Sequence, residues 1–258
     1  MSISHPYYRI VRPGVSHEYV LDKRYASDRL QLSRAYLNIE KSLCNIFDFI
    51  EPAEENLKTY SFELYSLLLR ACTEVEVNFK AILNANGTDI ERSTIKDYKK
   101  IEKSSKLSEY TIILPNWRTG SKREEKRLTP FIIFTSKKTK QNWYWEYNQV
   151  KHNRESNFNY ANLGNCINAV AAILVLLYSQ FGRYCLTTYG ISNLDCGDED
   201  TYDGSLDANT IFEIIPPDKG RWKPDELYSF DFEKIKNEKS PFQKYDYNHL
   251  NQGKKGKK

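Results

Sequence analysis

The residues best suited to chemistry lie in one short stretch, Asn142–Arg154. Placed on a helix at ~100° per residue, Asn148, Lys151 and His152 share one side, next to the ring of Tyr144. Histidine can transfer a proton near neutral pH, and a lysine ammonium can offset charge that develops on phosphate oxygens. Such a group suits cleavage of an RNA phosphodiester by its own 2′-hydroxyl, which needs no metal.

The same residues have a purely structural interpretation. A histidine at a helix end is commonly a surface residue, because a cation there is favoured by the helix dipole. Large aromatic residues such as Trp143 and Trp145 are commonly core residues. One histidine is weak evidence for catalysis, so the pattern alone leaves both interpretations open.

The composition is that of a folded protein with an ordinary soluble surface. Of its 258 residues, 40% are hydrophobic and 28% are charged, which allows a packed core and excludes a disordered chain. No apolar signal segment is visible near Met1, and the longest apolar run, Ala169–Leu177, is far shorter than the ~20 residues that span a bilayer. We therefore expect a cytoplasmic protein with no membrane partner.

The cysteines suggest neither disulfides nor a metal site. There are five, all single, and no CxxC pair occurs. Cys44, Cys72 and Cys166 fall in apolar helical stretches, where a cysteine behaves as a small hydrophobic residue. The sequence predicts no metal and no cofactor.

Apolar residues recur three and four positions apart over much of the chain, which predicts helices. The last of these helices is apolar nearly all round, so we expect it at the centre of the fold. The predicted helices are Ser27–Ile50, Ser61–Asn84, Ile90–Lys103, Thr139–Arg154 and Asn159–Thr187.

Two stretches rich in β-branched and aromatic residues, Glu109–Leu114 and Leu128–Thr135, predict a β-hairpin inserted between the helices. The basic segment Asn116–Arg127 would join the two strands. Taken alone it is a solvated connection, but its cations are also candidate contacts for RNA phosphates. The candidate RNA-binding residues are Lys122, Arg123, Lys126, Arg127, Lys137 and Lys138.

The ends of the chain look different from its middle. Ile211–Ile215 and Leu227–Phe232 predict short strands that could join the hairpin in one sheet, and the acidic segment Asp195–Asp203 is expected to be a solvated loop. The predicted organisation is an N-terminal arm (1–24), a helical bundle (25–189) with the hairpin at about 109–135, a C-terminal extension (190–240) and a disordered basic tail (241–258).

The segment Asn148-Gln-Val-Lys-His152 resembles the HEPN motif, an arginine followed by four to six residues and a histidine, often as Arg-Asn-x-x-x-His. The helix around Leu67–Lys80 and the alanine-rich helix Asn159–Tyr178 are similar to those of HEPN bundles. The resemblance covers about Arg29–Thr187. It implies a mainly α fold, a HEPN-like helical bundle of four to five helices with an inserted β-hairpin and a small β-containing C-terminal extension.

The resemblance also implies roles. His152 would be the general acid and base, Asn148 would position the phosphate, and Lys151 and Arg154 would stabilise charge. The family further implies a homodimer in which two motifs face each other, RNA (tRNA or mRNA) as substrate, and an antitoxin or other defence protein as a possible regulator. Tyr147 stands where the family has its arginine. Supporting residues would be Glu74, Arg70 and Tyr144.

Three hypotheses therefore stay open. The first is a metal-independent endoribonuclease of HEPN type, acting as a toxin or antiviral effector. The second, favoured by the missing arginine, is a non-catalytic HEPN-like module for binding nucleotide or RNA or for dimerisation. The third is an interaction protein that works through the segment after Gly190.

Overall fold

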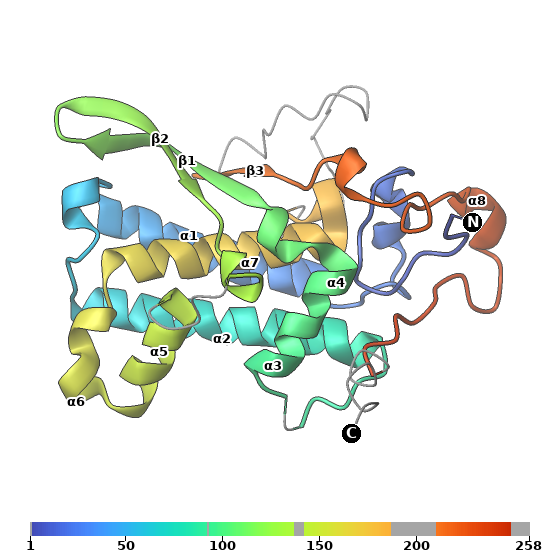
Figure 1. The fold of residues 1–258 in the computed structure, drawn as a ribbon, viewed down its shortest axis with the longest axis horizontal. Coiled ribbons are helices and arrows are strands. Elements are labelled where there is room, and N and C mark those ends of the chain that lie inside the picture. The colour runs from blue at the N-terminus through green and yellow to red at the C-terminus, as the bar shows by residue number, and fades with distance from the viewer. Residues whose placement is uncertain (1, 92, 137–141, 187–209, 249–258) are drawn as a thin grey trace, which may run out of the picture.

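One apolar helix, α7 (Leu163–Phe181), forms the centre of the fold. All of its residues except Gly164 and Asn168 are buried. Helices α1 (Arg29–Phe47), α2 (Phe62–Ala85) and α5 (Trp143–His152) pack around it (Figure 1). The computed structural model describes residues 2–91, 93–136, 142–186 and 210–248, and it confirms the mainly helical fold and the central place of this helix.

Local hydrogen bonds and glycines explain where the long helices begin and end. The hydroxyl of Ser61 accepts a hydrogen bond from the backbone N–H of Leu64 at 3.1 Å, so α2 begins where the sequence predicts. Helix α7 begins later than predicted, because Asn162 caps it. It ends at Gly182, whose φ is 55° and whose added Cβ would lie 2.1 Å from Nδ1 of His17, so only glycine fits there.

Short helical turns make the connections. The predicted helix Ile90–Lys103 is broken into pieces, and the last of them stops at Lys106, which has a left-handed backbone with φ 50°. The short α-helices are α3 (Ile95–Tyr98), α4 (Glu102–Ser105), α6 (Arg154–Asn157) and α8 (Phe232–Ile235). The 3-10 turns are His17–Leu21, Glu54–Asn56, Lys99–Ile101, Leu107–Glu109, Ile132–Phe134, Phe158–Tyr160, Gly182–Tyr184 and Lys219–Arg221.

The β-hairpin exists, but its second strand is not where the sequence predicts. Strand β1 (Thr111–Thr119) pairs antiparallel with β2 (Lys122–Leu128). The basic segment expected to be a loop thus forms most of the hairpin, and the predicted strand Leu128–Thr135 is wrong, since Ile132–Phe134 is a 3-10 turn. Strand β2 escapes a search for hydrophobic alternation because all its residues except Leu128 are polar, and six of the seven are not buried.

A third strand from the C-terminal extension completes the sheet. Strand β3 (Glu213–Ile215) pairs antiparallel with β1, in the order β2-β1-β3, so the predicted joining of tail and hairpin is confirmed. The other predicted tail strand, Leu227–Phe232, is wrong. In that segment only Tyr228 forms a bridge, with Ile3, because the chain there packs against the N-terminal segment.

The described ends of the chain pack against each other, so the predictions of a separate arm for residues 2–24 and of disorder for residues 241–248 are wrong. Ile10 and Tyr19 near the N-terminus are completely buried, and so is Tyr247. The N–H of Tyr8 donates to the carbonyl of Gln243 at 3.1 Å. Both segments therefore pack on the fold and contribute residues to its core, and residues 249–258 lie outside the described part.

Arg12 links the N-terminal segment to the parts of the chain that pack against it. Its guanidinium donates to the carbonyl oxygens of Ser104 at 3.2 Å and Glu226 at 3.1 Å. It also lies over the rings of Tyr7 and Trp222, each 5.3 Å from the ring centroid. A buried cation needs such partners, so Arg12 ties the N-terminal segment to the helices and to the C-terminal extension.

Among the described residues, one helical stretch, Leu163–Tyr184, is apolar and long enough to cross a membrane, but 89% of its apolar window is buried inside the protein.

Cys72, Cys166 and Cys185 are also buried, while Cys44 is half-buried. Burial raises the pKa of the Cys185 thiol to about 12.

A buried carboxyl fastens the C-terminal extension to α1. One oxygen of Glu40 accepts hydrogen bonds from the hydroxyls of Tyr36 (2.8 Å) and Thr210 (2.6 Å) and from the N–H of Ile211 (3.2 Å). Burial nevertheless raises the pKa of Glu40, because charge is costly away from water. The neutral form is thus favoured by folding.

We expect Glu40→Gln to flatten the dependence of stability on pH. Since the folded pKa lies above the unfolded one, Glu40 contributes most below its unfolded pKa and loses that contribution as the pH rises through the folded pKa. Glutamine keeps the acceptor oxygen and cannot ionise. In urea unfolding between pH 4 and 8, the free energy of unfolding of the variant should rise relative to that of the wild type as the pH rises. A constant difference would contradict this assignment.

Candidate functional site

Helix α5 carries the candidate motif and is anchored by its first turn. Asn142 caps it by accepting hydrogen bonds from the N–H groups of Tyr144 and Trp145, at 3.2 and 3.0 Å. The indole of Trp143 donates to the carbonyl of Pro130 at 2.8 Å. Residues 139–141 of the predicted helix lie outside the described residues.

Two members of the polar trio on α5, Asn148 and Lys151, make contacts within the chain. The amide of Asn148 donates to the backbone carbonyl of Tyr144 at 2.8 Å. The ammonium of Lys151 lies 5.2 Å from the centroid of the Tyr147 ring and 3.9 Å from Glu76. A hydrogen bond with Tyr147, which stands where HEPN proteins have arginine, and the charge of Glu76 raise the pKa of Lys151. Asn148 and Lys151 thus stabilise the local structure.

His152 is the last residue of α5 and is exposed. Within the described part of the chain, no hydrogen bond or ion pair reaches its ring. Arg154, on α6, places its guanidinium 5.8 Å from the Phe62 ring centroid and 5.7 Å from that of Tyr65. The four predicted catalytic residues therefore share one end of the bundle but do not bond to one another in a single chain.

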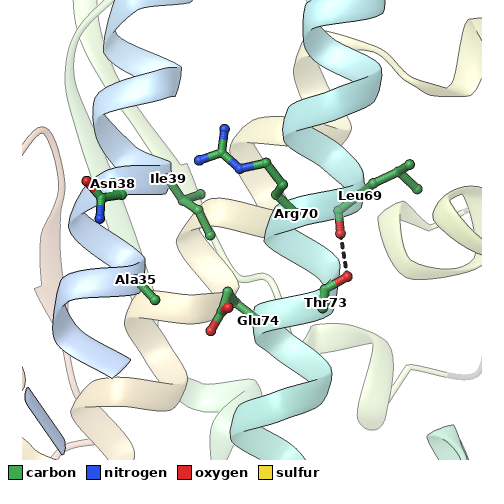
Figure 2. Close-up of a pocket in the computed structure, with 7 residues that line it drawn as sticks. All are labelled: Ala35, Asn38, Ile39, Leu69, Arg70, Thr73 and Glu74. Atoms are coloured by element: carbon green, nitrogen blue, oxygen red, sulfur yellow. Dashed lines mark hydrogen bonds between the residues drawn. The ribbon is translucent and has the colours of Figure 1, made fainter. Parts of the chain in front are cut away.

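The predicted supporting residues lie on two different sides of α2, with Tyr144 of α5 on one side and Arg70 and Glu74 on the other. Tyr144 donates to a carboxylate on α2 at 3.3 Å, but that carboxylate belongs to Glu76 and not to Glu74. Two residues along a helix are about 200° apart around its axis, so when Glu76 faces α5, Glu74 faces away. Figure 2 shows Glu74 and Arg70 in a groove of about 390 Å³ between α1 and α2.

The predicted RNA-binding cations of the hairpin are mostly paired with nearby carboxylates. Arg123 lies 3.7 Å from Glu51, and Lys126 lies 2.6 Å from Glu54, both on the loop after α1. Arg127 pairs with Glu125 on its own strand at 3.2 Å. Lys122 is exposed at the start of β2, and Lys137 and Lys138 lie outside the described residues. These ion pairs weaken the expectation that the hairpin offers free cations to RNA.

A cluster of aromatic rings beside Arg154 was not predicted. Phe158 contacts the rings of Tyr60, Phe62 and Tyr65, with centroids 5.6, 4.8 and 6.0 Å away. The side chains of Phe62 and Tyr60 are 66% and 52% exposed, which is unusual for such large rings. The signal in the sequence was Tyr60-Ser-Phe-Glu-Leu-Tyr65, in which two of three aromatic residues fall off the buried stripe of α2.

A second pocket, of about 330 Å³, lies between the hairpin and the start of α7. The N–H groups of Leu163, Gly164 and Asn165 already donate to oxygens of the chain, at 2.9 to 3.0 Å. The helix start therefore offers no free donors to an anion. In the described ranges, no group of three or more histidine, cysteine, aspartate or glutamate side chains could hold a metal ion. The pocket is lined by Leu57, Lys58, Trp117, Lys126, Leu128, Asn162, Gly164, Asn165, Ile167 and Asn168.

Comparisons with protein-family models, with curated proteins and with solved structures find no match to this chain.

We expect Glu76→Gln to lower the pKa of Lys151, because a nearby negative charge stabilises the ammonium. Glu74→Gln is the matched control, since Glu74 lies on the other face of the same helix. An NMR titration of the lysine side chains in both variants would test this. Equal Lys151 pKa values in the two variants would contradict the assignment of Glu76 to the motif.

Proposed function

We propose that the protein binds RNA at the end of the bundle formed by α6, the start of α2 and the last turn of α5. The observation that carries the proposal is an exposed ring paired with a cation, Phe62 beside the Arg154 guanidinium. The exposed ring of Tyr60 belongs to the same cluster, since it contacts Phe158, which also contacts Phe62. Exposed Lys151 and His152 lie on the adjoining turn of α5. The proposed ligand is a cytoplasmic tRNA or mRNA.

Physical chemistry favours unpaired RNA over a duplex at this surface. Aromatic side chains bind nucleic acid by stacking on the faces of unpaired bases, and each such stack contributes about 1–3 kcal/mol. A guanidinium can stack with the same rings and also meet a phosphate. Exposed Glu63 and Glu155 offset the charges of Lys151 and Arg154, so stacking carries more of the binding than charge does.

A metal-independent ribonuclease is the second candidate, and exposed His152 is the observation that favours it. A histidine with no partner in the described part of the chain is free to meet a substrate. Proton transfer at both oxygens of the scissile bond usually requires a second group, and none is bonded to His152 here. Cleavage would therefore require groups from a second copy, as the HEPN resemblance implies, or from a defence protein that regulates it.

We expect Phe62→Ala to weaken the binding of single-stranded RNA about tenfold, because one stacked base is lost. Phe49→Ala is the control, since Phe49 is 88% exposed but stands outside the aromatic cluster. Fluorescence anisotropy with a labelled single strand and with the matching duplex would measure both. Equal affinities for wild type and Phe62→Ala would refute the stacking surface.

For the second candidate, incubation with total RNA and a tRNA pool in EDTA tests cleavage directly. Metal-independent cleavage by the wild type and its loss in His152→Ala would establish a nuclease that uses this histidine. Binding without cleavage would leave RNA binding as the function. Cleavage that persists in His152→Ala would exclude this residue from the chemistry.

A further inference from the structure

The groove between α1 and α2 carries a second, separate surface. Figure 2 shows Arg70 and Glu74 directed from α2 into the space beside α1. They are four residues apart, and so lie about one helical turn from each other. The walls of the groove also contain Ala35, Asn38 and Ile39 from α1. The groove thus presents one cation and one anion side by side on a partly apolar floor.

These two charges do not neutralise each other. Arg70 donates instead to the hydroxyl of Ser42 on α1, at 3.2 Å. Among the described residues, the Glu74 carboxylate has no hydrogen-bond or ion-pair partner, although it is half-buried. Burial raises the pKa of Glu74. A carboxylate that is partly removed from water and unpaired is suited to a cation from outside the chain.

We propose that a second copy of this chain docks in the groove, with the two α2 helices antiparallel across a two-fold axis. In that arrangement Arg70 of each copy meets Glu74 of the partner subunit. A two-fold interface brings the same patch of both copies together, so it must be complementary to itself. An arginine and a glutamate one turn apart meet this condition, whereas a purely basic partner would satisfy Glu74 and be repelled by Arg70.

Apolar contacts are available along the same line. Val77 lies one turn beyond Glu74 on the outward side of α2 and is 40% exposed. Half-buried Ala35 lines the α1 side of the groove. Dimer interfaces need apolar contacts at their centre and charge complementarity for alignment. The axis would pass midway between Arg70 and Glu74 along α2.

This dimer differs from the one that the HEPN resemblance implies. Glu76 faces α5 and the groove lies on the other side of α2, so docking through the groove keeps the two His152 turns apart. No composite cleft between motifs would form. The inference does not depend on RNA binding, because either copy could bind RNA at its own α6 end.

Sedimentation velocity over a range of concentrations tests the dimer in the full chain. We expect the wild type to dimerise, and Arg70→Glu and Glu74→Arg each to weaken dimerisation tenfold or more, because each variant opposes like charges. The decisive sample is an equal mixture of the two variants, in which opposite charges again meet and dimers should return. Their return would also show that both variants are folded.

Glu124→Arg is the matched control, a charge reversal at an exposed position of β2 that does not line the groove. It should leave the dimer unchanged. A wild type that stays monomeric at the highest soluble concentration would overturn the proposal. So would a dimer that survives both single reversals, or a mixture that stays monomeric. The RNA-binding experiment with Phe62→Ala is read independently of all these outcomes.

Discussion

The need to bury α7 on every side is the constraint from which the rest of the structure follows. Its leucine, isoleucine and valine side chains each gain about 1.5–3 kcal/mol when removed from water, so exposure of any face would be costly. Helices α1, α2 and α5 cover much of it, and the sheet and the N-terminal segment cover other parts. The 3-10 turns His17–Leu21 and Leu107–Glu109 also contact α7.

Helix α2 acquires two distinct outer faces from this arrangement. Its apolar stripe must lie on α7, which turns Glu76 toward α5 and Glu74 toward α1. The first carboxylate steadies the motif helix through Tyr144 and Lys151. The second is left half-buried and unpaired in a groove. One buried stripe therefore separates a surface proposed for RNA from a surface proposed for a second copy.

Because the hairpin cations pair with carboxylates, the hairpin is a weaker candidate for RNA binding than the surface around Phe158. Arg118 and Arg123 share Glu51, and Lys126 meets Glu54, so carboxylates of the loop after α1 already pair with these cations of the hairpin. Exposed pairs of this kind contribute little to stability, but they lower the positive potential that would attract phosphates. The exposed rings around Phe158, with Arg154 on them, are left as the more distinctive feature.

Apolar residues spaced three and four positions apart predicted the long helices and the central place of α7, because such a stripe must be buried. The sequence also indicated the start of α2 near Ser61 and a tail strand beside the hairpin. Only the tertiary structure decided which carboxylate meets α5, since one step along a helix turns a side chain by about 100°. It alone brought Phe158 to Phe62, placed Tyr247 in the core and paired the hairpin cations. Contacts between residues far apart in the chain depend on packing, so they cannot be predicted from local periodicity.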